Sequence, residues 1–565
     1  MPGRWLVVLG IASACGGQLR VPNIAPGVDH LAAIRIEGNR AIETRALEPA
    51  LALHEAVRDG TALDPYLVTL DTERIRAAYL RRGFWDAKVT SRVEHRDDHA
   101  QIVVFTIREG RRATTRVEFA GLPPEVSPAS ARAQVVLRDG APFDYDSYEA
   151  AKQPLAALVA NAGYAHVRIT GQVIADPATA TATVRYEIEP GVRGRFGAIR
   201  IASPLPASLE AAVRARIRFA PGDRYSVSAL EASQAEIYDL GRFSMVQVGP
   251  DHEGGAAADD AEVNVVIELA LANRHELHAG FGVGIEPETY EARVRGGGSY
   301  VPARLPLMTL AADARVAVTI PRSLDLDQRE PKLRGLVSLS YLDLFVPRMR
   351  GEVEAGADQQ TVEAYTWTGK HIGLGLGSPL GPRWLQLRVG WVLEHVDTDP
   401  KTDPKIAIDS SKAGELGIGS AQLRGAYQAS LIADLRDNPI EPHRGAYLGL
   451  RATKGTRLAG GDLTYLQLTP ELRGYVALGD TVIAGRARVG AIFGDVPVTE
   501  RYYSGGTSGQ RGFSERRLSP TAPTMAGGSV PIGGAGLIEA GVELRRQLGT
   551  VWTFPVGANL FLDGG

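Results

Sequence analysis

The sequence predicts an array of α+β repeats in its first half and an all-β transmembrane barrel in its second half. A motif recurs at intervals of about eighty residues up to residue 271, and apolar and polar residues alternate from residue 272 onward. No apolar run reaches the ~20 residues that a membrane-spanning helix needs. A barrel crosses the membrane with short alternating strands instead, so all three observations agree with one another.

The composition limits the classes of function. A chain of 565 residues is too long for a single hydrophobic core, so we expect several domains. The formal net charge of -3 and the pI near 6.5 argue against nucleic acid as a partner. The sequence contains 1 cysteine, which excludes a disulfide within the chain.

The N-terminal residues have the pattern of an export signal. Arg4 supplies a positive charge, an apolar segment follows, and Ala12-Ser13-Ala14 is a small-residue cleavage site. Cys15 comes directly afterwards in a sequence similar to a bacterial lipobox, so we predict a signal peptide over residues 1–15 and lipidation of Cys15. Ordinary signal cleavage with a leftover thiol is the alternative. Residues 16–30, rich in Gly and Pro, are then a linker.

Three copies of one β-α-α-β-β module are expected at residues 31–110, 111–191 and 192–271. Each copy opens with an alternating strand, continues with a helix that ends at a glycine, and closes with strands before an acidic residue. The glycines are Gly83, Gly163 and Gly241, and the acidic residues are Glu109, Glu189 and Glu268. In the first copy we expect the helix at Arg74–Arg81, and in the second at Tyr148–Ala160.

The edges of such small sheets predict what the modules bind. A sheet edge leaves backbone N–H and C=O groups unpaired, and an extended segment of another chain can pair with them. We therefore expect the modules to bind unfolded polypeptide through its main chain. A spacer array that only holds a distance from the membrane is the alternative.

Residues 272–565 predict an outer-membrane type of barrel with about thirteen strands. A single strand is ambiguous, because a soluble β-sandwich shows the same alternation. The connections decide between the two. Eleven strands precede the long connection 494–534 and two follow it, which places this connection and 397–423 at one end of the barrel. The shorter turn 435–445 falls at the other end, as expected for a membrane barrel.

The connection 494–534 contains an arginine between glycines. Loops of this length are usually functional or disordered. Arg511 can form a bidentate pair with a carboxylate, and Gly505 and Gly506 let the backbone approach another wall closely. We interpret the segment as a loop folded back and held by Arg511. A solvated surface loop is the alternative for Arg511-Gly512-Phe513 taken alone.

Several motifs resemble one family. Gly38-Asn39 after a strand, with Tyr79 and Gly83-Phe84 after a helix, resembles the POTRA domain. Other parts of the chain resemble segments of the BamA and TamA outer-membrane assembly superfamily. These parts are the periplasmic turn Asp434, Arg436, Asp437, Asn438 and Pro439, the lumenal loop Gly505, Gly506, Arg511, Gly512 and Phe513, and the strands Gly541–Arg545 and Phe561–Gly565. The resemblance implies that Arg511 pairs with Glu543 and Asp563 on the inner wall.

The resemblance also implies a fold and a function. The fold would be α+β periplasmic POTRA repeats followed by a sixteen-stranded barrel, so that about three strands are expected beyond Gly565. Three modules favour the TamA branch or its lipoprotein variant. The implied function is to receive unfolded outer-membrane or autotransporter-type clients and to insert them through a lateral gate. The implied partners are these clients, the lipid bilayer and a TamB-like inner-membrane or periplasmic protein. A two-partner-secretion pore, which passes unfolded polypeptide through its lumen, is the alternative.

Gly280, Gly282 and Gly284 interrupt the first barrel strand. They predict a weak seam between the first and the last strand of the barrel, which could open sideways into lipid. Room for neighbouring aromatic side chains is the alternative explanation. The sequence does not favour an enzyme. The loop lacks the Gly-Lys-Ser/Thr ending of a phosphate-binding loop, Ser508 lacks the pattern of a nucleophile elbow, and the histidines lack metal-ligand spacing. We therefore expect no catalytic residue, cofactor or metal.

Overall fold

The computed structural model describes residues 29–96, 99–251, 261–285, 289–321, 329–507, 509–551 and 554–565. The predicted signal peptide, Cys15 and all but the last two residues of the predicted linker lie outside the described residues. The chain divides into two compact units, which are described separately. The first consists of Met1–Ala202, Ile217–Ala235 and Gln247–Glu268, and the second of Ser203–Arg216, Glu236–Val246 and Leu269–Gly565.

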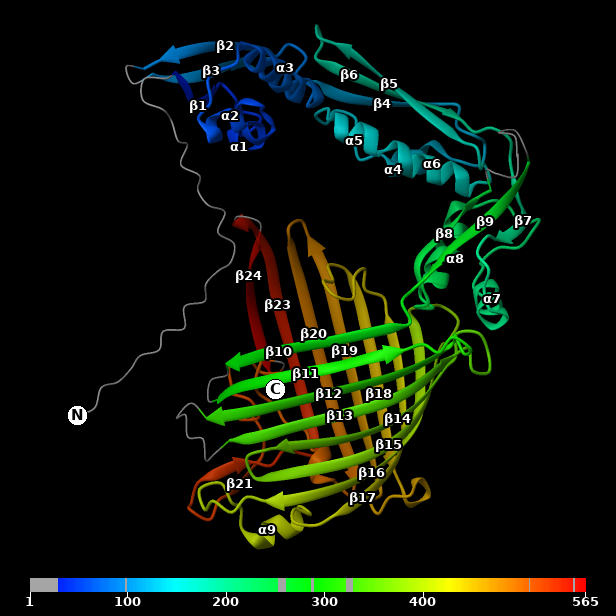
Figure 1. Cartoon of the computed structure of the whole chain (residues 1–565), viewed down its shortest axis with the longest axis vertical. Helices are drawn as coiled ribbons and strands as arrows, with labels where there is room; N and C mark the ends of the chain where they lie inside the picture. The colour runs from blue at the N-terminus through cyan, green and yellow to red at the C-terminus, as the bar shows by residue number, and fades with distance from the viewer. Residues whose placement is uncertain are drawn as a thin grey trace. The chain divides into compact units, whose positions relative to one another are not determined.

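Three small sheets of the same topology follow one another along the chain (Figure 1). In each sheet the last strand lies in the middle, and the first strand runs parallel to it. The strands are β1 (His30–Glu37), β2 (Lys88–His95) and β3 (Ala100–Arg108); β4 (Thr114–Ala120), β5 (Arg168–Asp176) and β6 (Thr181–Glu189); and β7 (Arg195–Ile201), β8 (Phe243–Pro250) and β9 (Glu262–Leu271). The shared strand order agrees with three copies of one folding unit.

The first module places its helices between β1 and β2. They are α1 (Thr44–Leu47), η1 (Glu48–Ala50), α2 (Leu53–Asp59) and α3 (Pro65–Arg81). Helix α3 begins before the predicted start at Arg74, because Asp64 caps it by accepting a hydrogen bond from the Tyr66 N–H, with Pro65 at the first position. It ends before Gly83, whose φ of 83° suits a glycine at a helix end.

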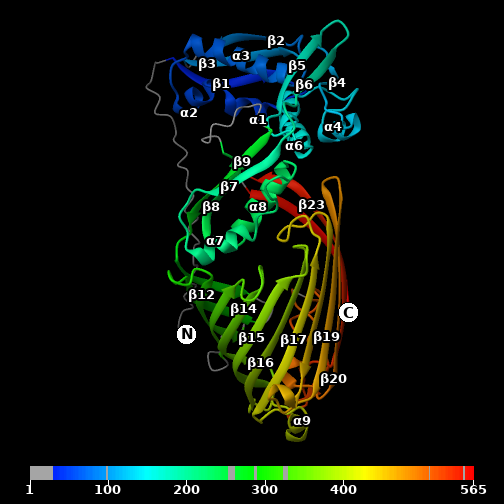
Figure 2. The same ribbon diagram turned by 90° about the vertical axis from the view of Figure 1, so that its right-hand side faces the viewer.

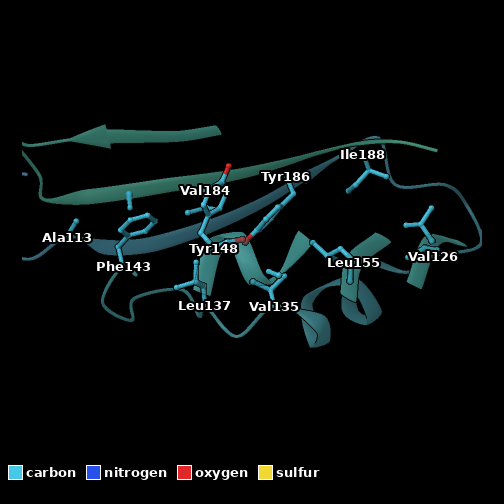
Figure 3. Close-up of a cluster of buried hydrophobic side chains, with 14 of the residues drawn as sticks. Ala113, Val126, Val135, Leu137, Phe143, Tyr148, Leu155, Val184, Tyr186 and Ile188 are labelled. Carbon is cyan, nitrogen blue, oxygen red and sulfur yellow. The ribbon is translucent and has the colours of Figure 1, made fainter. Parts of the chain in front are cut away.

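The second module has α4 (Pro128–Gln134), α5 (Tyr145–Ala150) and α6 (Lys152–Asn161). The sequence predicts one helix over Tyr148–Ala160, and the structure breaks it at Ala151. Pro154 explains the break, because proline has no N–H and its ring clashes with the carbonyl group four residues earlier. Tyr148, Leu155 and Tyr186 pack in the core between these helices and the sheet (Figure 3). The third module adds α7 (Ala207–Arg214) and α8 (Val227–Tyr238).

The second half of the chain forms one sheet of 13 strands within the described residues, in which sequence neighbours pair antiparallel from β10 to β24 (Figures 1 and 2). Eleven strands precede the connection that carries Arg511 and two follow it, as the alternation predicts. The strands are β10 (His275–Ile285), β11 (Thr289–Tyr300), β12 (Met308–Pro321), β13 (Glu330–Leu342), β14 (Arg350–Thr361), β15 (Tyr365–Pro379), β16 (Leu385–Pro400), β17 (Gln422–Asp434), β18 (Gly445–Gly455), β19 (Tyr465–Leu478), β20 (Thr481–Gly494), β23 (Gly536–Val551) and β24 (Phe554–Gly564).

The two ends of this sheet differ. The connection between β16 and β17, which contains α9 (Ser410–Glu415), and the connection between β20 and β23 lie at one end, here named the loop end. The turn between β17 and β18 lies at the other, here named the turn end. Strands β10 and β18 run in the same direction, from the turn end to the loop end, because neighbours along the sheet alternate in direction.

The two faces of the sheet also differ. One face, here named the inner face, carries ion pairs between strands. Arg488 pairs with Glu539 on the neighbouring strand, and Arg388 of β16 reaches across β15 to Glu352 of β14. The alternate residues, such as Leu387 and Val389, lie on the outer face. Among the described residues, no helix combines the length and the apolar character required to cross a membrane. The fold class predicted from the sequence, α+β modules followed by an all-β barrel sheet, is confirmed.

Candidate functional site: the Arg511 loop on the inner face of the sheet

The connection between β20 and β23 has its own structure at the loop end. It contains η4 (Val498–Glu500) and a small hairpin of β21 (Thr521–Pro523) and β22 (Ser529–Pro531). Tyr502 and Gly534 exchange two backbone hydrogen bonds, both of 2.9 Å, which close the base of the segment between them. The segment from Tyr502 to Gly534, here named the Arg511 loop, therefore leaves and rejoins the wall at one place.

Arg511 joins this loop to β23 and β24. Its Nε and Nη2 atoms lie 2.8 and 2.9 Å from the two carboxylate oxygens of Asp563, and Nη1 lies 3.6 Å from Oε2 of Glu543. The ring of Phe561 lies under the guanidinium, 3.6 Å from ring centroid to Cζ. The structure thus brings Arg511 together with both acidic residues named from the family resemblance. A bidentate pair of this kind fixes orientation as well as distance.

The clamp between Arg511 and Asp563 is shielded from solvent. The Asp563 side chain is 5% exposed and the Arg511 side chain 25%. Gly541 lies directly opposite Asp563 in the register of β23 and β24. A Cβ atom at Gly541 would lie 2.6 Å from Oδ1 of Asp563, so a glycine is needed for the carboxylate to reach the arginine.

Gln510 stands where an apolar residue is commoner in the resembled family, and the structure gives it a partner. Its Nε2 atom donates to the backbone oxygen of Gly564 over 2.5 Å, and the residue is 3% exposed. The loop is consequently attached to β24 by two consecutive residues, Gln510 and Arg511. The Gln510 side chain therefore helps to hold the loop against β24, because its buried amide has a hydrogen-bond partner in the Gly564 oxygen.

Glu539 is a second attachment point, and sequence reasoning missed it. This buried carboxylate accepts hydrogen bonds from Ser504 Oγ at 2.6 Å and from Arg488 Nη2 at 2.7 Å. Arg488 and Glu539 are direct partners in the register of β20 and β23. The sequence shows a charged residue on the polar face of β20 and another on the polar face of β23. It does not show that the two are partners, because that depends on the register of the strands.

The loop glycines permit a compact backbone. Gly505 has a φ of 106°, and a Cβ atom there would lie 2.4 Å from the Ser514 oxygen, so the two sides of the loop touch at this position. Gly506 has a φ of 84° and donates its N–H to the Phe513 oxygen over 2.9 Å. Gly512 has no atoms close to the Cβ position, and Phe513 is 50% exposed. Ser508 lies outside the described residues.

The turn motif between β17 and β18 is stabilised by its own side chains. Arg436 donates from Nε and Nη2 to the two oxygens of Asp434 over 2.7 Å each, and from Nη1 to the Pro439 oxygen over 3.2 Å. Asn438 Oδ1 accepts from the Ile440 N–H over 2.9 Å. The five predicted turn residues therefore lie together in one structured connection at the turn end.

Asp437 organises the far side of this turn. Its Oδ1 atom accepts from the backbone N–H groups of Arg444, His443 and Asn438, at 3.1, 3.0 and 2.9 Å. The hydrogen bonds from Arg444 and then His443 lower the pKa of Asp437 below its ordinary value, because they favour the charged carboxylate.

The three predicted gate glycines lie on the inner face of β10. Within the described residues β10 pairs with β11 alone, over its whole length. Gly282 and Gly284 are opposite Arg293 and Glu291, and a Cβ atom at Gly282 would lie 2.9 Å from Nε of Arg293. These glycines therefore make room for long charged side chains of the next strand. Gly280 has open space at its Cβ position.

Fold and site define an outer-membrane β-barrel protein with periplasmic α+β repeats. Residues 294–565 match the Omp85 superfamily domain, and residues 30–110 match the POTRA family, described as a surface antigen variable number repeat. The second half of the chain therefore carries an Omp85 superfamily domain. It is located in the outer membrane, with its POTRA domains in the periplasm. Since strand β9 of the third module leads into β10, the turn end of the barrel is periplasmic and the loop end extracellular.

Known proteins resemble most of the chain. It is 24% identical over 513 residues to the outer membrane protein assembly factor BamA of Nitratidesulfovibrio vulgaris, across 87% of this chain. It spans 60% of the length of that relative. BamA from Haemophilus ducreyi lacking POTRA domains 1–3 has a similar fold, with a TM-score of 0.50 at 14% identity, covering 80% of this chain and 86% of that one. CdiB from Escherichia coli matches with a TM-score of 0.42 at 13% identity, covering 89% and 88%.

The Omp85 domain and the BamA relative agree with the prediction that the chain is not an enzyme. The TamA branch within the superfamily stays a prediction, as do the signal peptide and the lipidation of Cys15.

Proposed function

We propose that this chain assembles outer-membrane proteins, which it receives unfolded through its modules and inserts into the bilayer beside its own barrel. The single observation that carries the proposal is the clamp of Arg511 on Asp563, reinforced by Gln510 and Glu539. A loop attached to two adjacent strands of the wall, β23 and β24, holds that part of the wall in a defined shape. The Nitratidesulfovibrio vulgaris relative is an outer membrane protein assembly factor, which supports the same proposal.

The first step is capture of the client. Within the described residues, each edge strand of a module sheet pairs on one side only, with the middle strand. An extended client segment can pair through its main chain with the N–H and C=O groups on the other side. Main-chain pairing requires little of the client sequence, which suits a factor with many clients. The likeness of the three sheets supports POTRA modules at residues 111–191 and 192–271 as well as at 31–110.

The second step is transfer into the membrane. Unpaired backbone groups cost several kcal/mol each in hydrocarbon, so a strand cannot enter lipid without a partner. β10 is the proposed gate strand, and its edge supplies N–H and C=O groups in the spacing that a client strand needs. The glycines on its inner face lower the packing that opposes separation at this seam. The driving force in this proposal is the hydrogen bonding that each client strand gains from a sheet neighbour.

The test is to deplete the chain from its host and to supply variants from a plasmid. Arg511→Ala is expected to lower the amount of client barrels in the outer membrane, because the loop loses its clamp. Arg517→Ala is the matched control. It lies in the same loop and pairs with Glu363 at 3.2 Å, with both side chains about a third exposed or more. We expect it to keep client levels near those of the wild type.

Two outcomes count against the proposal. Unchanged client levels and unchanged heat stability of the Arg511→Ala protein remove the loop from the mechanism. Loss of a polypeptide from the medium, with outer-membrane barrels at normal levels, favours the two-partner-secretion pore instead. A TamB-like partner stays a prediction, which co-purification with the wild-type chain can check.

A further inference from the structure

The outer face of the barrel contains an apolar hollow over strands β13 to β18. Its volume is about 770 Å³, within the range of ligand pockets in proteins. Its lining includes Leu339, Val353, Leu374, Trp391, Tyr427 and Lys454. These six residues are consecutive partners in the strand register and form one row across the wall. Figure 2 shows β15, β16 and β17 side by side in this region.

Small side chains in the neighbouring row produce the hollow. On the periplasmic side of Trp391, Tyr427 and Lys454, the next outer-face row contains Val389, Ala429 and Ala452. The row beyond that is again large, with Leu387, Leu431 and Leu450. Two alanines between rows of large side chains leave a groove, here named the outer groove, that runs across the strands.

The β18 end of the outer groove carries positive charge. Lys454 is the last member of the large row, and Arg457 follows in η3 (Arg457–Ala459). Trp391 Nε1 donates to the Ala459 oxygen over 2.9 Å, and a Cβ atom at Gly425 would lie 2.2 Å from the same oxygen, so η3 rests on the outer face beside the groove. Within the described part of the chain, neither Lys454 nor Arg457 has a side-chain hydrogen bond or ion pair.

We propose that the outer groove binds one phosphate-bearing lipid of the outer leaflet. An acyl chain lies over Ala429 and Ala452, and the phosphate group is held by Lys454 and Arg457. The charges select the occupant. A zwitterionic or neutral lipid gains only the apolar contact, whereas an anionic headgroup also gains about 1 kcal/mol for each basic residue near the surface.

The location excludes other occupants. The groove faces the hydrocarbon of the bilayer, where a polypeptide segment would leave its own backbone groups unsatisfied. A soluble anion would bind the two cations and leave the apolar groove unused. This inference needs only a barrel in the outer membrane, so it stands apart from the proposed function.

The experiment uses native mass spectrometry of the full chain in detergent, with phosphatidylglycerol as the anionic probe and phosphatidylcholine as the zwitterionic one. The wild type is expected to retain one phosphatidylglycerol in preference to phosphatidylcholine. Lys454→Ala should weaken retention of phosphatidylglycerol about fivefold. Ala452→Leu, which fills the groove with a side chain that lipid tolerates, should also reduce retention while the charges remain.

Lys370→Ala is the matched control. Lys370 is exposed on the outer face toward the extracellular end of β15, and it does not line the groove. Its removal should leave retention unchanged. Equal losses in Lys454→Ala and Lys370→Ala would overturn the proposal, since any basic residue of the wall would then serve. Equal retention of both lipids, or full retention by Ala452→Leu, would overturn it as well.

Discussion

Arg511 and Asp563 face each other through two parallel hydrogen bonds of 2.8 and 2.9 Å, although they are 52 residues apart in the chain. Glu543, the other acidic neighbour of Arg511, lies 3.6 Å from a single nitrogen atom and also pairs with Arg545 at 3.3 Å. The two carboxylates are therefore not equivalent. Asp563 sets the position of the arginine, and Glu543 adds charge beside it.

The first prediction concerns this difference. Asp563→Asn should destabilise the folded barrel by about 2–3 kcal/mol, because it removes a charged acceptor from a nearly buried pair. Glu543→Gln should have a smaller effect, since its contact is longer and shared. The measurement is the temperature at which the folded band disappears in semi-native electrophoresis. A larger loss for Glu543→Gln would contradict the assignment.

The second prediction concerns Gln510. Gln510→Leu restores an apolar residue as in the resembled family, yet here it should destabilise the loop by about 1–2 kcal/mol, because the Gly564 oxygen loses its donor. The readout is the rate of limited proteolysis within residues 502–534. Gln467→Leu is the control on the same inner face, where the amide reaches the Glu500 oxygen only at 3.4 Å. Its proteolysis rate should stay close to that of the wild type.

The third prediction is a pH dependence of the turn between β17 and β18. The hydrogen bonds from Arg444 and His443 lower the folded-state pKa of Asp437, so its contribution is present above the unfolded pKa of about 4 and is lost as the pH falls through the folded value. Wild type should therefore exceed Asp437→Asn in heat stability at pH 7, with the difference shrinking below about pH 4. If the difference in heat stability between the wild type and Asp437→Asn stays the same from pH 7 to pH 3, the charge of Asp437 is not its cause.

The fourth prediction concerns the first module. The carboxylate of Asp71 is 0% exposed and accepts the N–H groups of Ala52 and Leu53 over 2.8 Å each, at the start of α2. Asp71→Ala leaves these groups without the acceptor and should cost about 2 kcal/mol of local stability. Hydrogen exchange of residues 48–60 in the full chain measures it. Glu73→Ala, at an exposed position of the same helix, should leave that exchange unchanged.

The fold could be predicted to a large extent because its signals are local. Period-two alternation located eleven strands before the Arg511 loop and two after it, since each strand shows one polar and one apolar face. The lengths of the helices were harder to predict from the sequence. The start of α3 depends on the cap at Asp64, and the break between α5 and α6 depends on the proline at position 154.

The site could be predicted from the sequence only in part, for a different reason. A family resemblance identified Glu543 and Asp563 as neighbours of Arg511, and the structure brings the three together. Glu539 and its contacts to Arg488 and Ser504 were missed, because they depend on how β20 and β23 align across a long connection. A shift of one residue in that register would move Glu539 to the outer face.

The clamp also imposes an order in time on the folding of this chain. Gln510 and Arg511 bind atoms of β24, which is synthesised after the whole loop and after β23, so the loop stays without its anchor until β24 has paired. Contacts between residues far apart in sequence form late, because the intervening chain must first be ordered. The loop is therefore expected to resist protease only after β24 has paired with β23, so protease resistance of the loop reports that pairing.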